Sequence, residues 1–246
     1  MKRILVTTAL FALSTVSTLA ADMAPRTYTK ASMVDPSYNW SGLYVGGDLG
    51  YQTSGLGLAD PRQGVLTYDT KSDGFAGGGH IGYQHQWNHV VLGIEGDYIG
   101  ATGSTSFATP AVNIFSPGGL GVASTRLKDL WTFGGRAGVA FDNWLPYVTG
   151  GYAEGRFGFN AQTLPTGLTQ DFSPRFSGVY IGGGVEWAPW KDGWTVAAEY
   201  RHYYFDTKTL SVPSSDVFVE QIDFKPKADT VMGRVSYKFG PLFGAY

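Results

Sequence analysis

The sequence contains no cysteine, few charged residues and, after its first 20 residues, no long apolar run. Without cysteine the chain can form neither a disulfide bond nor a thiolate metal site. Charged residues make up 15% of the chain, compared with about 25% in an ordinary globular protein. The net charge of −2 is not the excess of positive charge that predicts binding to nucleic acid. A membrane-spanning helix needs about 20 consecutive apolar residues, so none is expected in the mature chain.

The first residues have the pattern of a secretory signal peptide. A basic pair, Lys2 and Arg3, precedes an apolar stretch over 4–13, and small residues follow up to Ala20. This order predicts export and cleavage after Ala20. The apolar stretch is too short for a transmembrane anchor. The predicted organisation is a signal peptide over 1–20, an irregular periplasmic leader over 21–40 and one domain over 41–246.

What the chain does contain is a series of segments in which apolar residues alternate with polar residues or glycine. Each is about 11 to 16 residues long, whereas strands of soluble proteins average about 5–6 residues. A tilted strand that crosses a bilayer needs about 9–11. Glycine recurs in every segment, which argues against helices. The eight predicted strands are 41–51, 74–86, 90–101, 126–141, 145–159, 176–188, 194–205 and 228–239.

The connections between these segments alternate in length. Those at 87–89, 142–144 and 189–193 are short. Those at 52–73, 102–125, 160–175 and 206–227 are long and contain much glycine, serine, threonine and proline. Short turns on one side and long loops on the other are typical of outer-membrane barrels, and a sheet that faces lipid must be closed. The predicted fold is all-β: an eight-stranded antiparallel up-and-down transmembrane β-barrel.

Tryptophan positions provide an independent test of this prediction. Amphipathic rings gather at the two membrane interfaces of a barrel, whereas in a soluble sandwich they would gather in the core. Six tryptophans fall at or beside the short-turn ends, and Trp131 lies near the opposite end of its strand. The predicted aromatic girdle consists of Trp40, Trp87, Trp131, Trp144, Trp187, Trp190 and Trp194.

Five stretches carry a family resemblance: YNWSGLYVGGDLGY (38–51), GIEGDY (93–98), LPYVTGGYAEG (145–155), GVEW (184–187) and AAEYRHYYF (197–205). Their order and spacing resemble the small outer-membrane barrel proteins of alphaproteobacteria, porin-family surface antigens related to the OmpA membrane domain. The resemblance covers about 38–246 and implies a Gram-negative outer membrane, but no catalytic residues. Such barrels commonly end in an aromatic residue that the barrel-assembly machinery reads. Here Phe239 and Tyr246 are alternatives for that signal.

The segment VLGIEGDYIG (91–100) places two carboxylates in a mostly apolar run. If Leu92 and Ile94 face lipid, alternation sends Glu95 and Asp97 into the barrel. The same parity sends His80 and charges on other strands inward at a similar height, roughly 12–16 Å above the short-turn side, with Glu154, Arg156 and Glu186 above and below this layer. Such charges are tolerable when they are paired, and an eight-stranded lumen is just wide enough for side chains. The predicted lumen charge network is Asp48, Glu95, Asp97, Arg136, Glu154, Arg156, Glu186, Glu199, Arg201 and Arg234.

These residues predict a structural, envelope-integrity and surface-facing role, with at most weak pore activity. The alternatives are a passive diffusion porin and a surface binder of haem or a host factor through loops such as 102–125. A lipid-modifying enzyme is disfavoured because His202 has no serine nearby in its strand. His85 and His89 flank a strand turn instead of sharing a helix face, so no metal site is predicted. No catalytic residue and no cofactor are predicted, and the expected partners are outer-membrane lipid, lipopolysaccharide and the barrel-assembly machinery.

Overall fold

The structure is a computed structural model that describes residues 38–59, 66–102, 105–109, 120–164, 169–190, 192–212 and 220–240. The signal peptide, most of the leader, half of loop 102–125 and Tyr246 lie outside these ranges. Within them, no helix is long and apolar enough to cross a membrane. The described strands are β1 (Gly42–Ala59), β2 (Leu66–Trp87), β3 (Val90–Ala101), β4 (Thr105–Thr109), β5 (Leu120–Val139), β6 (Trp144–Leu164), β7 (Thr169–Phe172), β8 (Arg175–Trp187), β9 (Trp194–Phe205), β10 (Lys208–Val212) and β11 (Glu220–Lys238).

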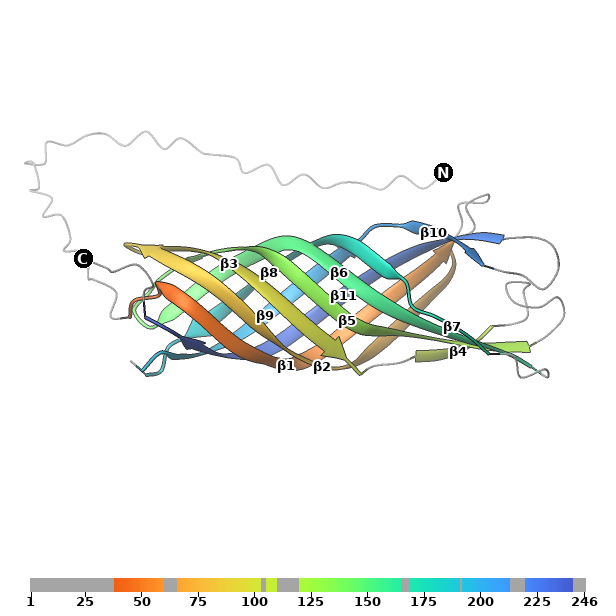
Figure 1. The fold of residues 1–246 in the computed structure, drawn as a ribbon, viewed down its shortest axis with the longest axis horizontal. Coiled ribbons are helices and arrows are strands. Elements are labelled where there is room, and N and C mark those ends of the chain that lie inside the picture. The colour runs from red at the N-terminus through yellow and green to blue at the C-terminus, as the bar shows by residue number, and fades with distance from the viewer. Residues whose placement is uncertain are drawn as a thin grey trace, which may run out of the picture. The chain divides into compact units, whose positions relative to one another are not determined.

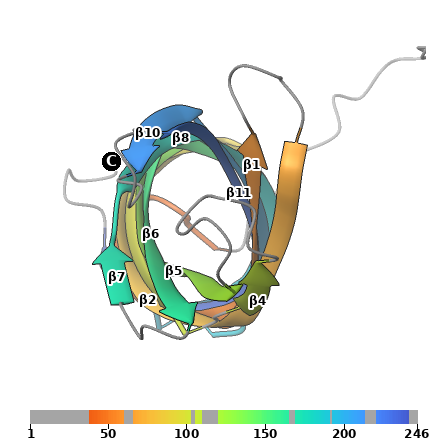
Figure 2. The same cartoon turned by 90° about the vertical axis from the view of Figure 1, so that its right-hand side faces the viewer.

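Eight of these strands close into an antiparallel barrel. The pairing runs β1–β2–β3–β5–β6–β8–β9–β11, and β11 then pairs with β1. The closing register sets Asp48 opposite Arg234. Viewed along its axis, this part of the chain forms a complete ring (Figure 2). The predicted eight-stranded up-and-down barrel is therefore confirmed.

The strands extend farther into the long connections than the sequence predicts. β1 continues to Ala59, and β6 continues to Leu164. The short strands β4, β7 and β10 add to β5, β6 and β11 on the same side, where Figure 1 shows long hairpins. The prediction that these connections are loops is wrong in these parts. Backbone pairing continues beyond the bilayer, whereas the apolar alternation that reveals a strand ends where lipid no longer covers one face.

The short turns are as tight as predicted. Asn88 and Asp142 both have a φ of 53°, a left-handed conformation that asparagine and aspartate tolerate better than most residues. Phe141 and Trp144 exchange backbone hydrogen bonds of 2.8 Å across the second turn. These turns lie together at one end of the barrel, which we call the short-turn end, opposite the long-connection end (Figure 1).

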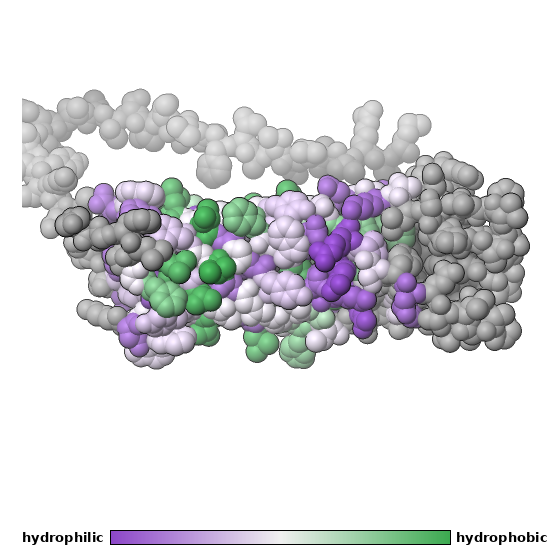
Figure 3. Space-filling model, in the orientation of Figure 1, coloured by the Kyte–Doolittle hydropathy of each residue, from purple (hydrophilic) through white to green (hydrophobic). Residues whose placement is uncertain are grey.

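Alternation along the strands gives the barrel an apolar outer wall. Leu49, Ile81, Ile94, Val148 and Ile181 are among the large side chains exposed on it, and Figure 3 shows apolar residues gathered on this wall. An outer apolar band and a polar interior are the reverse of a soluble barrel and are characteristic of a barrel in lipid.

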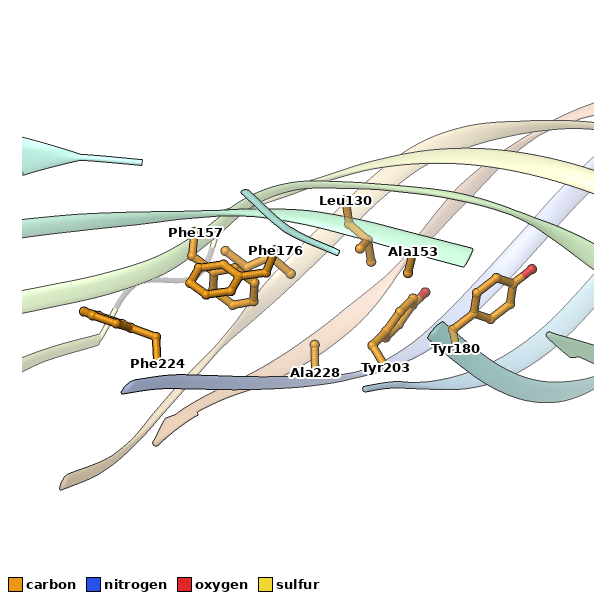
Figure 4. Packing of buried hydrophobic residues seen from close by; sticks show 9 residues of the cluster. Leu130, Ala153, Phe157, Phe176, Tyr180, Tyr203, Phe224 and Ala228 are labelled. Atoms are coloured by element: carbon orange, nitrogen blue, oxygen red, sulfur yellow. The ribbon is translucent and has the colours of Figure 1, made fainter. Parts of the chain in front are cut away.

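Buried side chains fill the interior at both ends. Near the long-connection end, Phe157, Phe176, Tyr203 and Phe224 form an apolar cluster with smaller neighbours (Figure 4). At the short-turn end, a second cluster consists of Tyr38, Trp40, Val91, Ala140, Leu145 and Ala188. The charged side chains lie at strand positions between these two clusters.

Candidate functional site

Eight of the ten side chains predicted for the lumen network lie buried inside the barrel. They come from six of the eight barrel strands, which bring together residues up to 186 positions apart in sequence. Three are arginines and five are carboxylates. They are Asp48, Glu95, Asp97, Arg136, Glu186, Glu199, Arg201 and Arg234.

Arg234 on β11 is at the centre of this layer. Its Nε lies 2.8 Å from Asp48 Oδ1, and its Nη2 lies 3.0 Å from Asp97 Oδ1. Its Nη1 lies 3.0 Å from Glu95 Oε1 and 2.8 Å from Glu199 Oε2. One guanidinium therefore binds four carboxylates from three strands, which the planar fork of donors makes possible.

The other two arginines complete the layer across the lumen. Arg201 Nη2 lies 2.8 Å from Glu95 Oε1, and its Nη1 lies 3.0 Å from Asp97 Oδ2. Arg136 Nη2 donates to Glu186 Oε2 at 2.6 Å, and its guanidinium lies 3.9 Å from the ring centroid of Tyr147. Each cation is thus paired with a carboxylate, as a charge buried away from water requires.

The five carboxylates of the layer outnumber its three guanidinium groups. Other side chains supply further hydrogen bonds to the carboxylates. Sequence reasoning placed His80 in the lumen but missed these polar partners, because a lone tyrosine or threonine in a strand carries no distinctive signal. Tyr44 Oη donates to Glu95 at 2.8 Å, and Tyr147 Oη donates to Glu199 at 2.8 Å. The remaining partners are Thr132 on Asp97 (2.9 Å), Thr195 on Glu186 (2.6 Å) and His80 Nδ1 with Asp48 (2.9 Å).

Glycines make room for the aromatic members of this layer. The ring of Tyr44 lies across Gly82, which is its direct cross-strand partner. Tyr147 lies across Gly184 in the same way. Because glycine has no Cβ, a ring can lie flat on the neighbouring strand and point its hydroxyl into the lumen. The glycine-rich strands are therefore part of the construction of the network.

Asp48, His80 and Asp97 are close enough to suggest a metal site, which the sequence did not predict. One ligand atom from each lies within 4.8 Å of the others. However, Arg234 binds both aspartates, and a guanidinium between two carboxylates occupies the position that a metal cation would need. The donor set fits an ion-pair network better than a metal centre.

Glu154 and Arg156 do not belong to the lumen, and their prediction as network members is wrong. On β6 the inward positions are odd-numbered, as buried Tyr147 and Thr149 show, so even-numbered side chains point outward. Glu154 accepts a hydrogen bond from Arg175 Nη1 at 2.8 Å. Arg156 forms a close ion pair with Asp129. Both pairs lie on the outer wall near the long-connection end.

The predicted girdle tryptophans lie on the outer wall, with one exception. Trp87, Trp144, Trp187, Trp190 and Trp194 are exposed at the short-turn end, and Trp144 stacks on Trp187 with ring centroids 5.4 Å apart. Trp131 lies toward the opposite end and donates to Glu154 Oε1 at 3.2 Å. Trp40 is the exception: it is 0% exposed inside the barrel mouth, so its prediction as a lipid-facing residue is wrong.

Trp40 closes the short-turn end because the chain bends into the barrel before β1. Gly42 has a φ of 144°, which a residue with a side chain rarely adopts. The Trp40 backbone N–H donates to Gln86 Oε1 at 2.7 Å. The Tyr38 ring packs edge-on against the indole, with ring centroids 4.8 Å apart. Burial raises the pKa of the Tyr38 phenol, and the Glu186 carboxylate raises it further. The end of the predicted leader is thus part of the barrel core.

We expect Trp40→Phe to lower the free energy of unfolding by about 1 kcal/mol, because the smaller ring leaves part of the buried space empty. Urea unfolding of the protein in lipid vesicles, followed by tryptophan fluorescence, would measure the change. Trp190→Phe is the matched control, since Trp190 is 60% exposed, and its effect should stay within about 0.5 kcal/mol. Equal effects of the two substitutions would contradict the closure of the mouth by Trp40.

The apolar outer band, the aromatic residues at its ends and the charged interior define a class of protein, the outer-membrane β-barrels. The chain belongs to the outer membrane protein beta-barrel domain family, whose model matches residues 7–239. This membership places the protein in the outer membrane of a Gram-negative bacterium. No curated protein sequence matches the chain.

Several solved structures have a similar fold at low sequence identity. OprG from Pseudomonas aeruginosa is 14% identical with a TM-score of 0.49, over 83% of this chain and 98% of that one. Ail of Yersinia pestis, solved in complex with the heparin analogue sucrose octasulfate, is 15% identical with a TM-score of 0.43, over 80% and 99%. The outer-membrane protease OmpT from Escherichia coli is 14% identical with a TM-score of 0.43, over 85% and 100%.

Proposed function

We propose that the protein is a closed structural barrel of the outer membrane, with an envelope-integrity and surface-facing role and at most weak pore activity. The observation that carries this proposal is the layer of three arginines and five carboxylates across the lumen. All eight side chains are buried and belong to one hydrogen-bonded network. A diffusion porin needs an open aqueous path, and barrels with wide channels have 16–18 strands.

Several finer expectations belong to the same proposal. The signal peptide is removed after Ala20, the termini face the periplasm and the long connections face outward, because an even number of strands puts both ends on the side of the short turns. Phe239 or Tyr246 marks the barrel for assembly. The five sequence stretches support a relationship with the alphaproteobacterial surface antigens. The protein is not an enzyme, and any surface ligand would bind the long connections.

Single-channel recording of the purified, refolded protein tests the closed lumen. We expect low or intermittent conductance at neutral pH, because every path along the axis crosses the buried ion pairs. A refolded barrel with intact strands is the required starting material, and circular dichroism would verify it. A large, steady conductance would contradict the proposal and favour the porin.

Mass spectrometry of lipid A from cells with and without the protein would reveal a lipid-modifying enzyme.

A further inference from the structure

Charged side chains form a collar on the outer wall, just beyond the apolar band at the long-connection end. The collar repeats one order on different walls: a tyrosine, then a carboxylate, then cations. Tyr51 donates to Asp73 at 2.6 Å, and Tyr200 donates to Asp229 at 2.6 Å. Tyr152 donates to Glu154 at 3.3 Å. Figure 3 shows hydrophilic residues gathered beside the apolar ones on the face that it presents.

The wall formed by β5, β6 and β8 carries a concentrated group of cations, which we call the cation cluster: Arg126, Lys128, Arg156 and Arg175. Gly158 on β6 lies beside two members of the cluster. It is the register partner of Arg126, and a Cβ atom built on it would lie 2.5 Å from Lys128 Cε. Lys128 Nζ also donates to Ser173 Oγ at 2.7 Å. Asp129, Glu154 and the exposed Asp171, which accepts a hydrogen bond from Asn160 on β6, are the carboxylates on this wall. Four cations therefore face three carboxylates, which leaves an excess of one positive charge.

Two of these carboxylates hold the arginines in place without covering them. Asp129 accepts from Arg156 Nε at 2.7 Å, and Glu154 accepts from Arg175 Nη1 at 2.8 Å. Nevertheless, 40% of the Arg156 side chain and 55% of the Arg175 side chain stay exposed. A guanidinium has five N–H donors, so each arginine keeps donors that point away from its carboxylate. These are positioned cations with free hydrogen-bonding capacity.

The height of the cluster corresponds to the headgroup region of the outer leaflet. Tyr152 ends the apolar face of β6, and aromatic rings of this kind lie at the membrane interface. Arg156 is four residues farther along the strand. At about 3.3 Å per residue and a 45° tilt, it lies roughly 9 Å beyond the ring level. Hydrocarbon has ended at that height, and lipid headgroups surround the wall.

We propose that the cation cluster binds the phosphate groups of an outer-leaflet glycolipid, with Arg156 and Arg175 as the main ligands. Arginine forks match phosphate oxygens and form strong charge-assisted hydrogen bonds with them. The excess positive charge on this wall is complementary to a phosphorylated headgroup, whose acyl chains would lie on the apolar band below. The inference rests on the outward orientation of the long connections, and it does not depend on whether the lumen is closed.

Native mass spectrometry of the full refolded barrel in detergent, titrated with bis-phosphorylated lipid A, tests the proposal. The double variant Arg156→Gln/Arg175→Gln should bind lipid A at least about tenfold more weakly than the unmutated protein. Lys225→Gln/Lys227→Gln is the matched control, since it removes two exposed cations from β11 on another wall and should leave most binding intact. Dephosphorylated lipid A should bind the unmutated protein as weakly as lipid A binds the double variant.

Three results would overturn the proposal. Unchanged lipid A binding by the double variant would show that the cluster is not the site. Equal losses in both double variants would show attraction by overall charge alone. Equal binding of phosphorylated and dephosphorylated lipid A would show that acyl chains, and not phosphates, determine the affinity. Circular dichroism and the heat-dependent gel shift of each variant would verify that its barrel has folded.

Discussion

Replacing Arg234 by alanine is expected to destabilise the barrel by about 3–5 kcal/mol, because the substitution leaves buried carboxylates without their cation. Arg234 lies within 3.0 Å of oxygens from Asp48, Glu95, Asp97 and Glu199. Without its guanidinium, these acids repel one another, and they must take up protons or admit water. Urea unfolding of the variant in lipid vesicles would measure the loss.

The same substitution should raise single-channel conductance, because it removes a large side chain from the middle of the lumen and weakens the network around it. Arg136→Ala should act in the same direction, since Arg136 binds Glu186 and reaches Tyr44 at 3.4 Å. Arg156→Ala is the matched control. Its side chain is 40% exposed on the outer wall, where an ion pair contributes about 1 kcal/mol or less. Conductance that is large in the unmutated protein and unchanged by Arg234→Ala would refute the closed lumen.

Replacing Gly82 by valine is expected to prevent most of the protein from reaching the folded barrel. A Cβ atom at this position would overlap the hydroxyl and ring of Tyr44, and it would lie 2.7 Å from the Ile94 carbonyl oxygen. Tyr44 would have to leave its place, which breaks its hydrogen bond to Glu95. Overpacking of this kind costs about 1–3 kcal/mol, and the unpaired buried carboxylate adds to that cost.

The measurement is the fraction of protein that shifts mobility on heating in a gel run without prior boiling, since closed barrels resist detergent until heated. Gly96→Val is the matched control, because Gly96 faces outward on β3 and the nearest atom to a Cβ there is 3.7 Å away. The control should fold nearly as well as the unmutated protein. Equal folding of the two variants would contradict the packing of Tyr44 on Gly82.

Residue alternation alone was sufficient to predict the barrel and most of its charged interior. Lipid on one face and side chains on the other impose a period of two on every spanning strand. For this reason the parity of Leu92 and Ile94 correctly sent Glu95 and Asp97 inward. Beyond the apolar band both faces of a strand meet polar surroundings, so the pattern disappears. That is why the ends of the strands and the small strands β4, β7 and β10 were not predicted.

Only the tertiary structure decided which charges meet and what surrounds them. Glu154 and Arg156 are charged like the network members, but the structure shows that the odd-numbered positions of β6 face the lumen. Both side chains therefore lie on the outer wall, where Arg175 and Asp129 pair with them. Trp40 has the sequence position of a girdle residue, yet the bend at Gly42 carries it into the barrel mouth. The sequence shows the type of each side chain and which side chains share one face of their own strand. Partners from other strands, such as Tyr44 for Glu95, depend on how the closed sheet sets those strands beside one another.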